Sequence, residues 1–399
     1  MDTITHGIAG ALIGKAIFRG EDMLASRAMN RARVITWALM LGAIFPDSDT
    51  FRDLLSRNEL LVITWHRSIT HSFVCLPFFA AALAALTRWF ARWRKWEAPS
   101  FAALTGIYAI GILSHILLDL VTSFGTMIWS PLNWSRPAWD LLFIIDFTFT
   151  TILLVPQFVA WAYANPGRVI LRTLGTWFFF ALGPLLVASM ARRAGVPISG
   201  TVIVASEVIL AALFFLPLVG GWGLRLPPSV WNRAGLTAGC VYLGLTFAAH
   251  EAALGRIKEF AASKLLEPES LGALPLPPSL WHWDGLIRTS HGVYEMRMNL
   301  AEKASMTEVT EASSLEYRFY PDAPPNSYIE LAKRLPEVQK VLWFSRFPVT
   351  QFHKESGYAV VEISDARFAS LQRERAGAFT YRVRFGPDGN VLSQGWARR

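Results

Sequence analysis

Long apolar runs alternate with short polar or basic stretches over the first 254 residues of this chain. Two short apolar segments come first, 4–18 and 34–45, and the earlier one is rich in Gly and Ala, which favours tight packing between helices. Each of the later runs is long enough, or nearly so, to cross a membrane as a helix. These runs are 73–90, 101–124, 141–163, 169–190, 201–219 and 234–254. The pattern predicts a mainly α protein, a polytopic helical membrane bundle.

The pattern changes after residue 254. Residues 255–280 hold a charged stretch and then a Pro-rich one, and they predict a linker. Beyond them, apolar and polar residues alternate as they do in strands, over 315–320, 357–363 and 378–385. We therefore expect a membrane domain of residues 1–254, a linker of residues 255–280, and a small α+β or mostly β extramembrane domain of residues 281–399.

Composition agrees with a membrane protein that has a water-soluble portion. The chain is 53% hydrophobic and only 17% charged, and its mean hydropathy is positive. A net charge of +8 raises the question of nucleic acid. Many of the arginines lie in short loops between apolar runs, where they orient a membrane protein, and basic patches with interleaved aromatic residues are not evident. We expect the lipid bilayer as a partner and no nucleic acid.

The distribution of basic residues predicts an orientation. Positive charge favours the cytoplasmic side of a membrane. If all the apolar segments cross, one set of loops carries most of the cations, and the opposite set carries Asp47, His66 and a Trp- and Pro-rich loop at 129–139. The loops with the aspartates and histidines, and the C-terminal domain, would then face away from the cytoplasm. The cationic set is Arg19, Arg27, Arg31, Arg33, Arg88, Arg92, Arg94, Lys95, Arg168, Arg172, Arg225 and Arg233.

The stretch from Trp65 to Ser72 concentrates polar groups just before an apolar run. It holds His66, Arg67 and His71. Ionisable groups at membrane depth are costly and usually functional. Under the alternating topology, further imidazoles and carboxylates reach the same side of the membrane at similar depth, and hydropathy does not force that coincidence. They are His6, Asp47, Asp49, His115 and Asp119.

Imidazole and carboxylate together suit a divalent metal, with zinc favoured and manganese or iron as alternatives. His115 and Asp119 are four residues apart, so they share one face of a helix. Whichever of Asp47 and Asp49 is not a ligand would serve as general base. Arg67 would hold a phosphate or stabilise a developing oxyanion. The candidate ligands are His6, Asp47, Asp49, His66, His71, His115 and Asp119.

Each of these residues also has a structural interpretation. A single histidine is more often structural than a ligand, so the prediction depends on the set. Arg67 could equally be an interface anchor. Asp2 and Asp140 could be helix N-caps. Asp146 lies deeper in an apolar run, so capping explains it less well.

Four motifs carry a resemblance to a known family. They are DTITH, PDSD, HRSITHS and SHILLD, which begin at residues 2, 46, 66 and 114. Together they resemble the bacterial family of membrane-bound, metal-dependent hydrolases typified by the inner-membrane protein YdjM. The resemblance covers roughly residues 1–150, and the later spans look like those of longer members. It implies a multi-pass protein of the bacterial inner membrane whose ligands are the seven residues named above.

These observations lead to two function hypotheses. The first is a metal-dependent hydrolase whose metal-activated water attacks an ester or phosphoester at the membrane surface, with a lipid or lipid-linked substrate. The second is a non-enzymatic membrane protein, either a metal or proton transporter or a structural partner. A transporter places its ionisable groups near the bilayer midplane on discontinuous helices. Most of the candidates here cluster toward one face, which favours surface chemistry.

Overall fold

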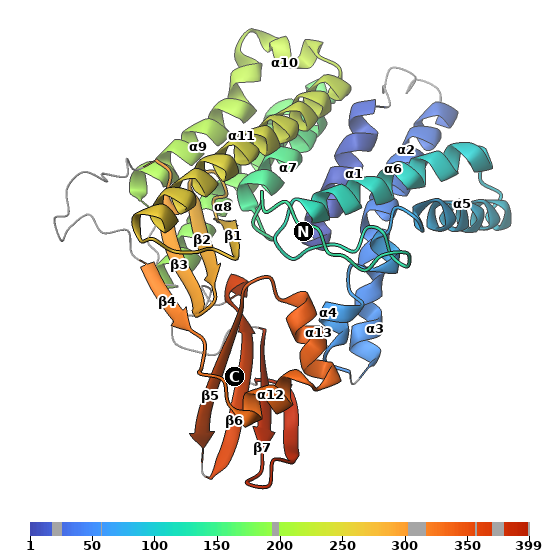
Figure 1. Ribbon diagram of the computed structural model, residues 1–399. Helices are drawn as coiled ribbons and strands as arrows, with labels where there is room; N and C mark the ends of the chain where they lie inside the picture. Colours follow the sequence, from blue (N-terminus) through green and yellow to red (C-terminus); the bar gives the residue numbers. More distant parts are fainter. Residues whose placement is uncertain are drawn as a thin grey trace.

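A computed structural model describes residues 1–17, 26–56, 58–193, 199–301, 317–355, 357–368 and 379–397. Within these residues, a group of helices is followed by two antiparallel sheets (Figure 1). The predicted class, a helical bundle with a β-containing second part, is confirmed. Arg19 lies outside the described residues, whereas Arg27, Arg31 and Arg33 belong to a helix rather than to a loop.

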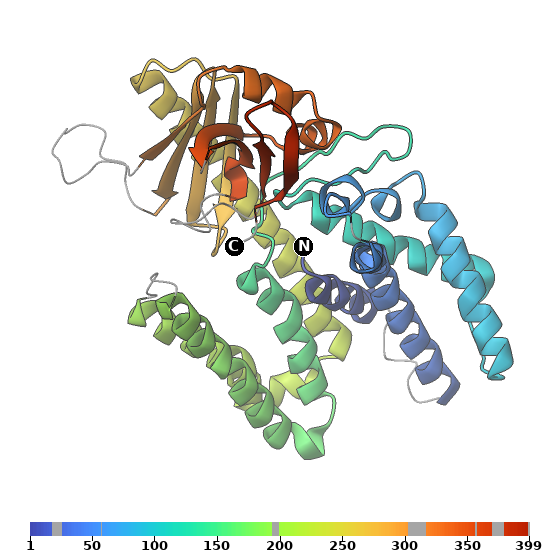
Figure 2. The ribbon, with the colours of Figure 1, turned by 90° about the horizontal axis from the view of Figure 1, so that it is seen from below.

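Among the described residues, eight long helices form the helical part. Among them, α2 packs between α1 and α6, and α7 packs against both α11 and α1. Seen from below, the green pair α8 and α9 lies on the opposite side of α7 and α11 from the blue α1 and α2 (Figure 2). The helices are α1 (Thr3–Ile17), α2 (Ser26–Ile44), α5 (Leu76–Trp93), α6 (Phe101–Leu120), α7 (Phe147–Tyr163), α8 (Val169–Arg193), α9 (Gly200–Phe215) and α11 (Pro228–Ser263).

Glycines set the distance between the first helices. A Cβ added at Gly10 of α1 would lie 2.7 Å from the carbonyl oxygen of Leu39 on α2. A Cβ at Gly111 of α6 would lie 2.7 Å from that same oxygen. At these two glycines, α1 and α6 therefore lie closer to the backbone of α2 than a residue with a side chain at the same position would allow. Gly10 follows His6 by four residues and Gly111 precedes His115 by four, so these contacts hold both histidines at one end of the helices.

Alanine at Gly111 is expected to lower the stability of the protein by about 1–3 kcal/mol, because the new Cβ would meet only backbone atoms of α2, which cannot give way. Gly106 on the same helix is the matched control, since a Cβ there meets nothing within 4 Å. Gly106→Ala should be neutral or slightly stabilising. Thermal unfolding in detergent compares the two variants, and equal midpoints would refute this account of the helix packing.

Fewer helices meet the length and hydropathy of a membrane span than the sequence predicts. Among the described residues, three qualify: Phe101–Leu120, Pro166–Ser189 and Gly200–Arg225. A fourth would be the pair Leu61–His71 and Leu76–Trp93, which is bent by 72°. The remaining difference arises in part because α7 has only 17 residues. In α11, the apolar part has only 16 residues, 234–249, between Arg233 and His250.

The beginning of α7 explains Asp146. This residue is the helix N-cap, and its carboxylate accepts the backbone N–H of Phe149 at 2.9 Å. It also accepts the hydroxyls of Tyr242, at 3.1 Å, and Ser279. Residues 141–146 are not helical, so the apolar run that appeared to bury Asp146 includes a capped helix start. Asp146 is therefore a structural residue, contrary to the expectation that capping explains it less well.

The two sheets have the orders β1-β2-β3-β4 and β5-β6-β7-β8, and every neighbouring pair is antiparallel. Helix α11 continues to Ser263, and β1 begins at Ser270. The last turns of α11 and the whole of β1 therefore fall inside the stretch 255–280 that was predicted as a linker. The strands are β1 (Ser270–Leu276), β2 (His282–Thr289), β3 (Gly292–Asn299), β4 (Tyr317–Pro321), β5 (Pro348–Glu355), β6 (Tyr358–Asp365), β7 (Thr380–Phe385) and β8 (Val391–Trp396).

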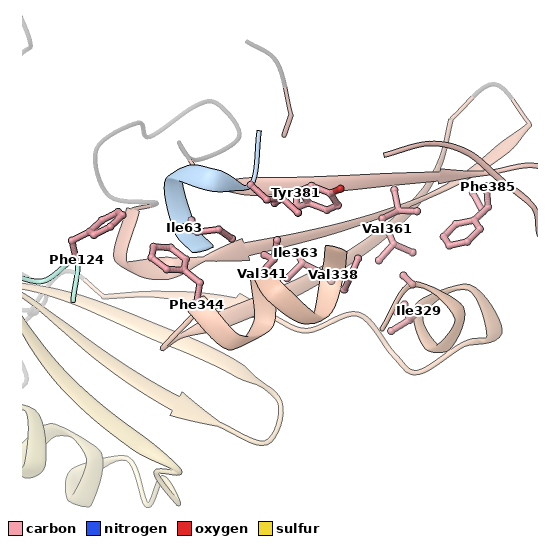
Figure 3. Packing of buried hydrophobic residues seen from close by; sticks show 14 residues of the cluster. Ile63, Phe124, Ile329, Val338, Val341, Phe344, Val361, Ile363, Tyr381 and Phe385 are labelled. Atoms are coloured by element: carbon pink, nitrogen blue, oxygen red, sulfur yellow. The ribbon is translucent and has the colours of Figure 1, made fainter. Parts of the chain in front are cut away.

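The sheets dock on the helical part in different ways. The first sheet packs on the last turns of α11, where Ile257 and Phe260 meet Trp283 and Met296. The second sheet is covered by α12 (Ser327–Lys333) and α13 (Pro336–Phe344). Its core also takes in Ile63, from the helical part of the chain (Figure 3).

Candidate metal centre

The eight residues that the sequence singles out come from segments that meet at one end of the helices. Between α2 and α5 the chain forms short elements instead of long helices: η2 (Phe45–Asp49), α3 (Thr50–Leu55), α4 (Leu61–Thr64) and η3 (Ile69–His71). These short turns let several polar side chains point toward α1 and α6. The eight residues are His6 on α1, Asp47 and Asp49 on η2, His66, Arg67 and His71 between α4 and the end of η3, and His115 and Asp119 on α6.

Four side chains offer donor atoms that lie within 4.8 Å of one another: Asp47, His71, His115 and Asp119. The two Nε2 atoms, of His71 and His115, are 3.0 Å apart. Oδ2 of Asp119 lies 3.2 Å and 3.3 Å from these two nitrogens. Oδ1 of Asp47 lies 3.7 Å and 3.5 Å from them. Ligands around a tetrahedral zinc ion are about 3.3–3.6 Å apart when the bonds are about 2.0–2.2 Å, so the spacing fits such an ion.

The hydrogen bonds of the two imidazoles support this fit. Nδ1 of His115 lies 2.6 Å from the carbonyl oxygen of Ala43, which can only accept, so Nδ1 carries the proton. Nδ1 of His71 lies 3.0 Å from Oγ1 of Thr70 and 3.5 Å from a carboxylate oxygen of Asp49. With the protons on Nδ1, both Nε2 lone pairs point at each other and at two carboxylates. A buried group of lone pairs suits a cation, and outer partners of this kind orient metal-binding histidines.

Asp119 is fully buried and its two oxygens face different partners. Oδ2 faces the four-donor group and has no hydrogen-bond partner among the described residues. Oδ1 lies 3.0 Å from Nη2 of Arg67 and 3.2 Å from Nε2 of His6, and it also contacts the amino group of Met1. One oxygen is thus held by cationic and polar groups while the other remains available to a metal ion.

Asp49 orients its neighbours. Its Oδ1 lies 2.9 Å from Nδ1 of His66, and its Oδ2 accepts the backbone N–H of Arg67 at 3.0 Å and the hydroxyl of Thr70 at 3.2 Å. Burial alone would raise the pKa of Asp49, but the hydrogen bond with His66 and the nearby ring of His71 lower it. The carboxylate therefore stays ionised and keeps its acceptors engaged. Its geometry is that of an orienting residue rather than of a fifth donor.

The pKa of Asp47 is set by the same opposing effects as that of Asp49, but the carboxylate of Asp47 belongs to the donor group. Burial would raise the pKa of Asp47, but hydrogen bonds from His115 and His71 outweigh burial and lower the pKa when Nε2 of these rings is protonated. At a metal ion the same Nε2 atoms would carry no proton, and the cation would take over the task of keeping Asp47 ionised. Its second oxygen, Oδ2, accepts the hydroxyl of Thr3 at 2.6 Å. The side chain of Asp47 is 10% exposed, whereas those of His71, His115 and Asp119 are fully buried. Of the four donor side chains, that of Asp47 is therefore the one with solvent-exposed surface.

Arg67 is part of the framework of the site. It is only 2% exposed, and Nη1 donates to Oγ1 of Thr122 at 2.9 Å while Nη2 pairs with Asp119. Its backbone has φ +62°, a left-handed conformation that non-glycine residues rarely adopt. Bonds from its N–H to Asp49 and from the N–H of Met127 to its carbonyl, at 2.9 Å, hold this conformation. Such local strain is typical of functional sites.

The second sheet and its helices close over this end of the site. The ring of Phe124 lies 5.8 Å from that of His66 and 5.3 Å from that of Phe344 on α13 (Figure 3). The guanidinium carbon of Arg67 lies 5.1 Å from the same ring centroid. Nη1 of Arg367 donates to the carbonyl oxygen of Ser123 at 2.7 Å. The loop after α6 is therefore held by the C-terminal domain on one side and touches the site on the other.

The structure brings all eight predicted residues together and separates them into roles. Asp47, His71, His115 and Asp119 form the donor group. His6 stacks on His115 with ring centroids 3.6 Å apart, and His66 lies beside His71 at 5.8 Å, both outside that group. Sequence reasoning did not single out Thr3, the Ala43 carbonyl or Phe124. Thr3 lies inside the DTITH motif, which was a usable signal, whereas nothing in the sequence marks a backbone carbonyl.

Asp2 and Asp140, two further acids that the sequence places near the candidate site, make structural contacts. Asp2 precedes α1 and accepts the backbone N–H of Thr5 at 2.9 Å, as a capping residue does. Asp140 pairs with Arg346 of the C-terminal domain, with Oδ2 2.8 Å from Nη2. The N-cap alternative therefore fits Asp2, but it is wrong for Asp140, because α7 begins only at Phe147 and Asp140 holds Arg346 instead.

Apolar spanning helices and a buried cluster of imidazoles and carboxylates define an integral membrane protein with a group of side chains able to hold a metal ion. Residues 1–196 match the family model described as YdjM inner membrane protein. The resemblance to the YdjM family is thus confirmed over residues 1–196, and together with the apolar helices this match supports a multi-pass protein of the inner membrane. No curated protein and no solved structure matches the chain.

Proposed function

We propose that this protein is a metal-dependent hydrolase that cleaves an ester or phosphoester at the membrane surface. The observation that carries the proposal is the set of four donor atoms, from Asp47, His71, His115 and Asp119, within 4.8 Å of one another. Zinc suits two imidazoles and two carboxylates best, and manganese or iron are alternatives. A divalent cation held there would supply an activated water and polarise the oxygen of the scissile bond.

The side chains around the donor group have separate tasks in this proposal. Asp49 and Thr70 fix the ring of His71, and the carbonyl of Ala43 fixes that of His115. Arg67 compensates the buried charge of Asp119 and keeps Oδ2 turned inward. Because the guanidinium of Arg67 is buried and engaged, we assign it this supporting task instead of direct contact with substrate.

His66 is the residue best suited to move a proton. Its Nδ1 bonds to Asp49, so Nε2 is the free ring atom, and the side chain is 18% exposed. A carboxylate that orients an imidazole in this way is a recurring arrangement for general bases. The sequence suggested Asp47 or Asp49 as the general base, but Asp47 belongs to the donor group and Asp49 has both oxygens engaged. We therefore propose that Nε2 of His66 accepts the proton of the attacking water.

The surroundings of the opening favour a substrate that reaches the site from the lipid. Ile4 on α1 is 74% exposed, Phe51 on α3 66% and Phe147 on α7 53%. Contacts between Thr3 and Asp47 and between Thr5 and Thr150 bring the first turns of α1, η2 and α7 together. Exposed apolar side chains on these turns suit a lipid or lipid-linked substrate, whose reacting group would lie at headgroup depth.

The orientation follows from the same charges as in the sequence. His71 just precedes α5, and Arg88, Arg92 and Lys95 lie at its other end, about 27 Å away for a helix of 18 residues. Since positive charge favours the cytoplasm, we propose that the site and the C-terminal domain face the non-cytoplasmic side. Cysteine accessibility tests this on an otherwise cysteine-free chain with a single new cysteine near the second sheet.

Hydrolysis is tested with purified protein and vesicles of mixed phospholipids. We expect chelation to abolish headgroup or acyl release and one equivalent of zinc or manganese to restore it. His66→Gln should lower kcat by about 100-fold or more, the contribution of a general base, with bound metal unchanged. Loss of metal in His66→Gln would instead make that residue a ligand.

A second assay on the same preparation distinguishes the transporter hypothesis from the hydrolase proposal. Proteoliposomes loaded with a metal-sensitive dye report uptake of zinc or manganese. Uptake that requires His71, together with no release from any ester or phosphoester tested, would replace the hydrolase proposal. Release without uptake would support the hydrolase.

A further inference from the structure

A second candidate site lies at the other end of α5, far from the donor group. A pocket of about 490 Å³ opens between the last turns of α5 and the first residue of α6. This volume is within the range of small-molecule sites. Figure 1 shows the turn that joins α5 to α6 on the outer side of the helix group, away from both sheets. The lining residues are Ala85, Arg88, Trp89, Arg92, Ser100 and Phe101.

The residues that line the pocket include two arginines and no acidic side chain. Arg88 and Arg92 are four residues apart on one helix, so they present their side chains on the same face. Nη1 of Arg88 donates to the carbonyl oxygen of Pro99 at 2.9 Å. Among the described residues, neither arginine pairs with a carboxylate, and the side chain of Arg92 makes no hydrogen bond. Two guanidinium groups and the hydroxyl of Ser100 are the donors that recognise a phosphate.

The walls of the pocket are apolar and face outward. Trp89 is 63% exposed and Phe101 is 47% exposed. Phe101 begins a helix with the length and hydropathy of a membrane span, and α5 belongs to the bent pair that forms another. Trp93 and Trp96 lie beyond the pocket, with exposed fractions of 65% and 57%. Arginines beside exposed tryptophans at the end of a span are the usual composition of a membrane–water interface.

From this combination we propose that the pocket binds the phosphate of an anionic phospholipid headgroup, with the acyl chains along Trp89 and Phe101. Inorganic phosphate shares the headgroup chemistry but would leave the aromatic walls unused. A zwitterionic lipid would bring an ammonium group toward two arginines. The site is therefore selective for net negative lipids. It is independent of the hydrolase proposal, since it lies at the opposite end of the helix that follows His71.

The test measures binding of dioleoyl phosphatidylglycerol to the detergent-purified full-length protein by native mass spectrometry. The double variant Arg88→Gln/Arg92→Gln should bind about 100-fold more weakly, because each hydrogen bond between a guanidinium and a phosphate contributes about ten-fold or more. Arg92→Gln alone should lose about ten-fold. This single variant guards against misfolding, since the side chain of Arg92 makes no hydrogen bond among the described residues, whereas Arg88 supports the turn through Pro99.

Arg94→Gln is the matched control. Arg94 belongs to the same basic cluster, but it stacks near Trp93 and Trp96 instead of lining the pocket. We expect it to bind phosphatidylglycerol like the parent protein. If all variants lose the same affinity for phosphatidylglycerol, the lipid is attracted by the general positive charge of this region, and the proposed site is wrong. Equal affinity for phosphatidylcholine and phosphatidylglycerol would also overturn the site. Displacement of the lipid by millimolar inorganic phosphate would overturn the lipid assignment in favour of a free anion.

Discussion

Replacing His71 by alanine is expected to lower the affinity of the protein for zinc or manganese by about 100-fold or more. Changes in residues that merely orient ligands cost about 10–100-fold, and His71 offers one of the four converging donor atoms. Purified protein should carry close to one equivalent of metal before the change and very little after it. Elemental analysis and titration with a competing chelator provide the measurement.

His353→Ala is the matched control for this experiment, because His353 is an exposed residue of β5. It should leave the metal content unchanged. His71 is a cleaner target than Asp119, since removing that carboxylate would also leave the buried Arg67 without its partner. Metal retained at full stoichiometry after both His71 and His115 are changed to alanine would eliminate the proposed centre.

Replacing Phe124 by alanine is expected to loosen the C-terminal domain and to disturb the metal site together. The ring is 9% exposed and belongs to the core of the second sheet, beside Ile63 and Phe344. Truncation of a buried phenylalanine costs about 3–5 kcal/mol. The same ring contacts His66 and Arg67, so metal affinity should also fall, by about ten-fold on the scale of orienting residues.

Limited proteolysis of the second sheet and metal titration together test this coupling. Phe51→Ala removes an aromatic ring that is 66% exposed on the nearby α3, and it should change neither readout. A Phe124→Ala protein that is less stable but binds metal as tightly as before would restrict the role of Phe124 to holding the domain.

The place of the site was predictable because it depends on helix order and spacing. His115 and Asp119 had to share a face of α6, and the alternating topology brought Asp47 and His71 to the same end. The assignment of roles was not predictable, since His66 and His71 differ by only five residues. Arg67, which lies between the two histidines, has a left-handed backbone conformation. On one side of it the ring of His66 faces Asp49, and on the other the ring of His71 faces the donor group.

The C-terminal part illustrates a different limit. Alternation of polar and apolar residues located strands such as β6 and β7, because each buries one face. It gave no indication that Phe124, an ordinary apolar residue after a span, would become part of the core of a sheet more than two hundred residues later. The charged stretch from 256 to 266 was helix-like in sequence, but nothing in it indicated that it continues the last apolar run as one helix, α11. Long-range packing of this kind leaves no local pattern.

The unbroken course of α11 gives the two sheets different mechanical freedom. The helix has 36 residues, about 54 Å of continuous rod. In its first half, Gly235 and Gly239 pack against Pro156 and Leu153 of α7. Its last turns pack against one face of the first sheet. That sheet can move only if the rod bends. Among the described residues, the contacts of the second sheet with the helical part all involve side chains, such as those of Arg367 and Phe124, so moving this sheet would require no helix to bend.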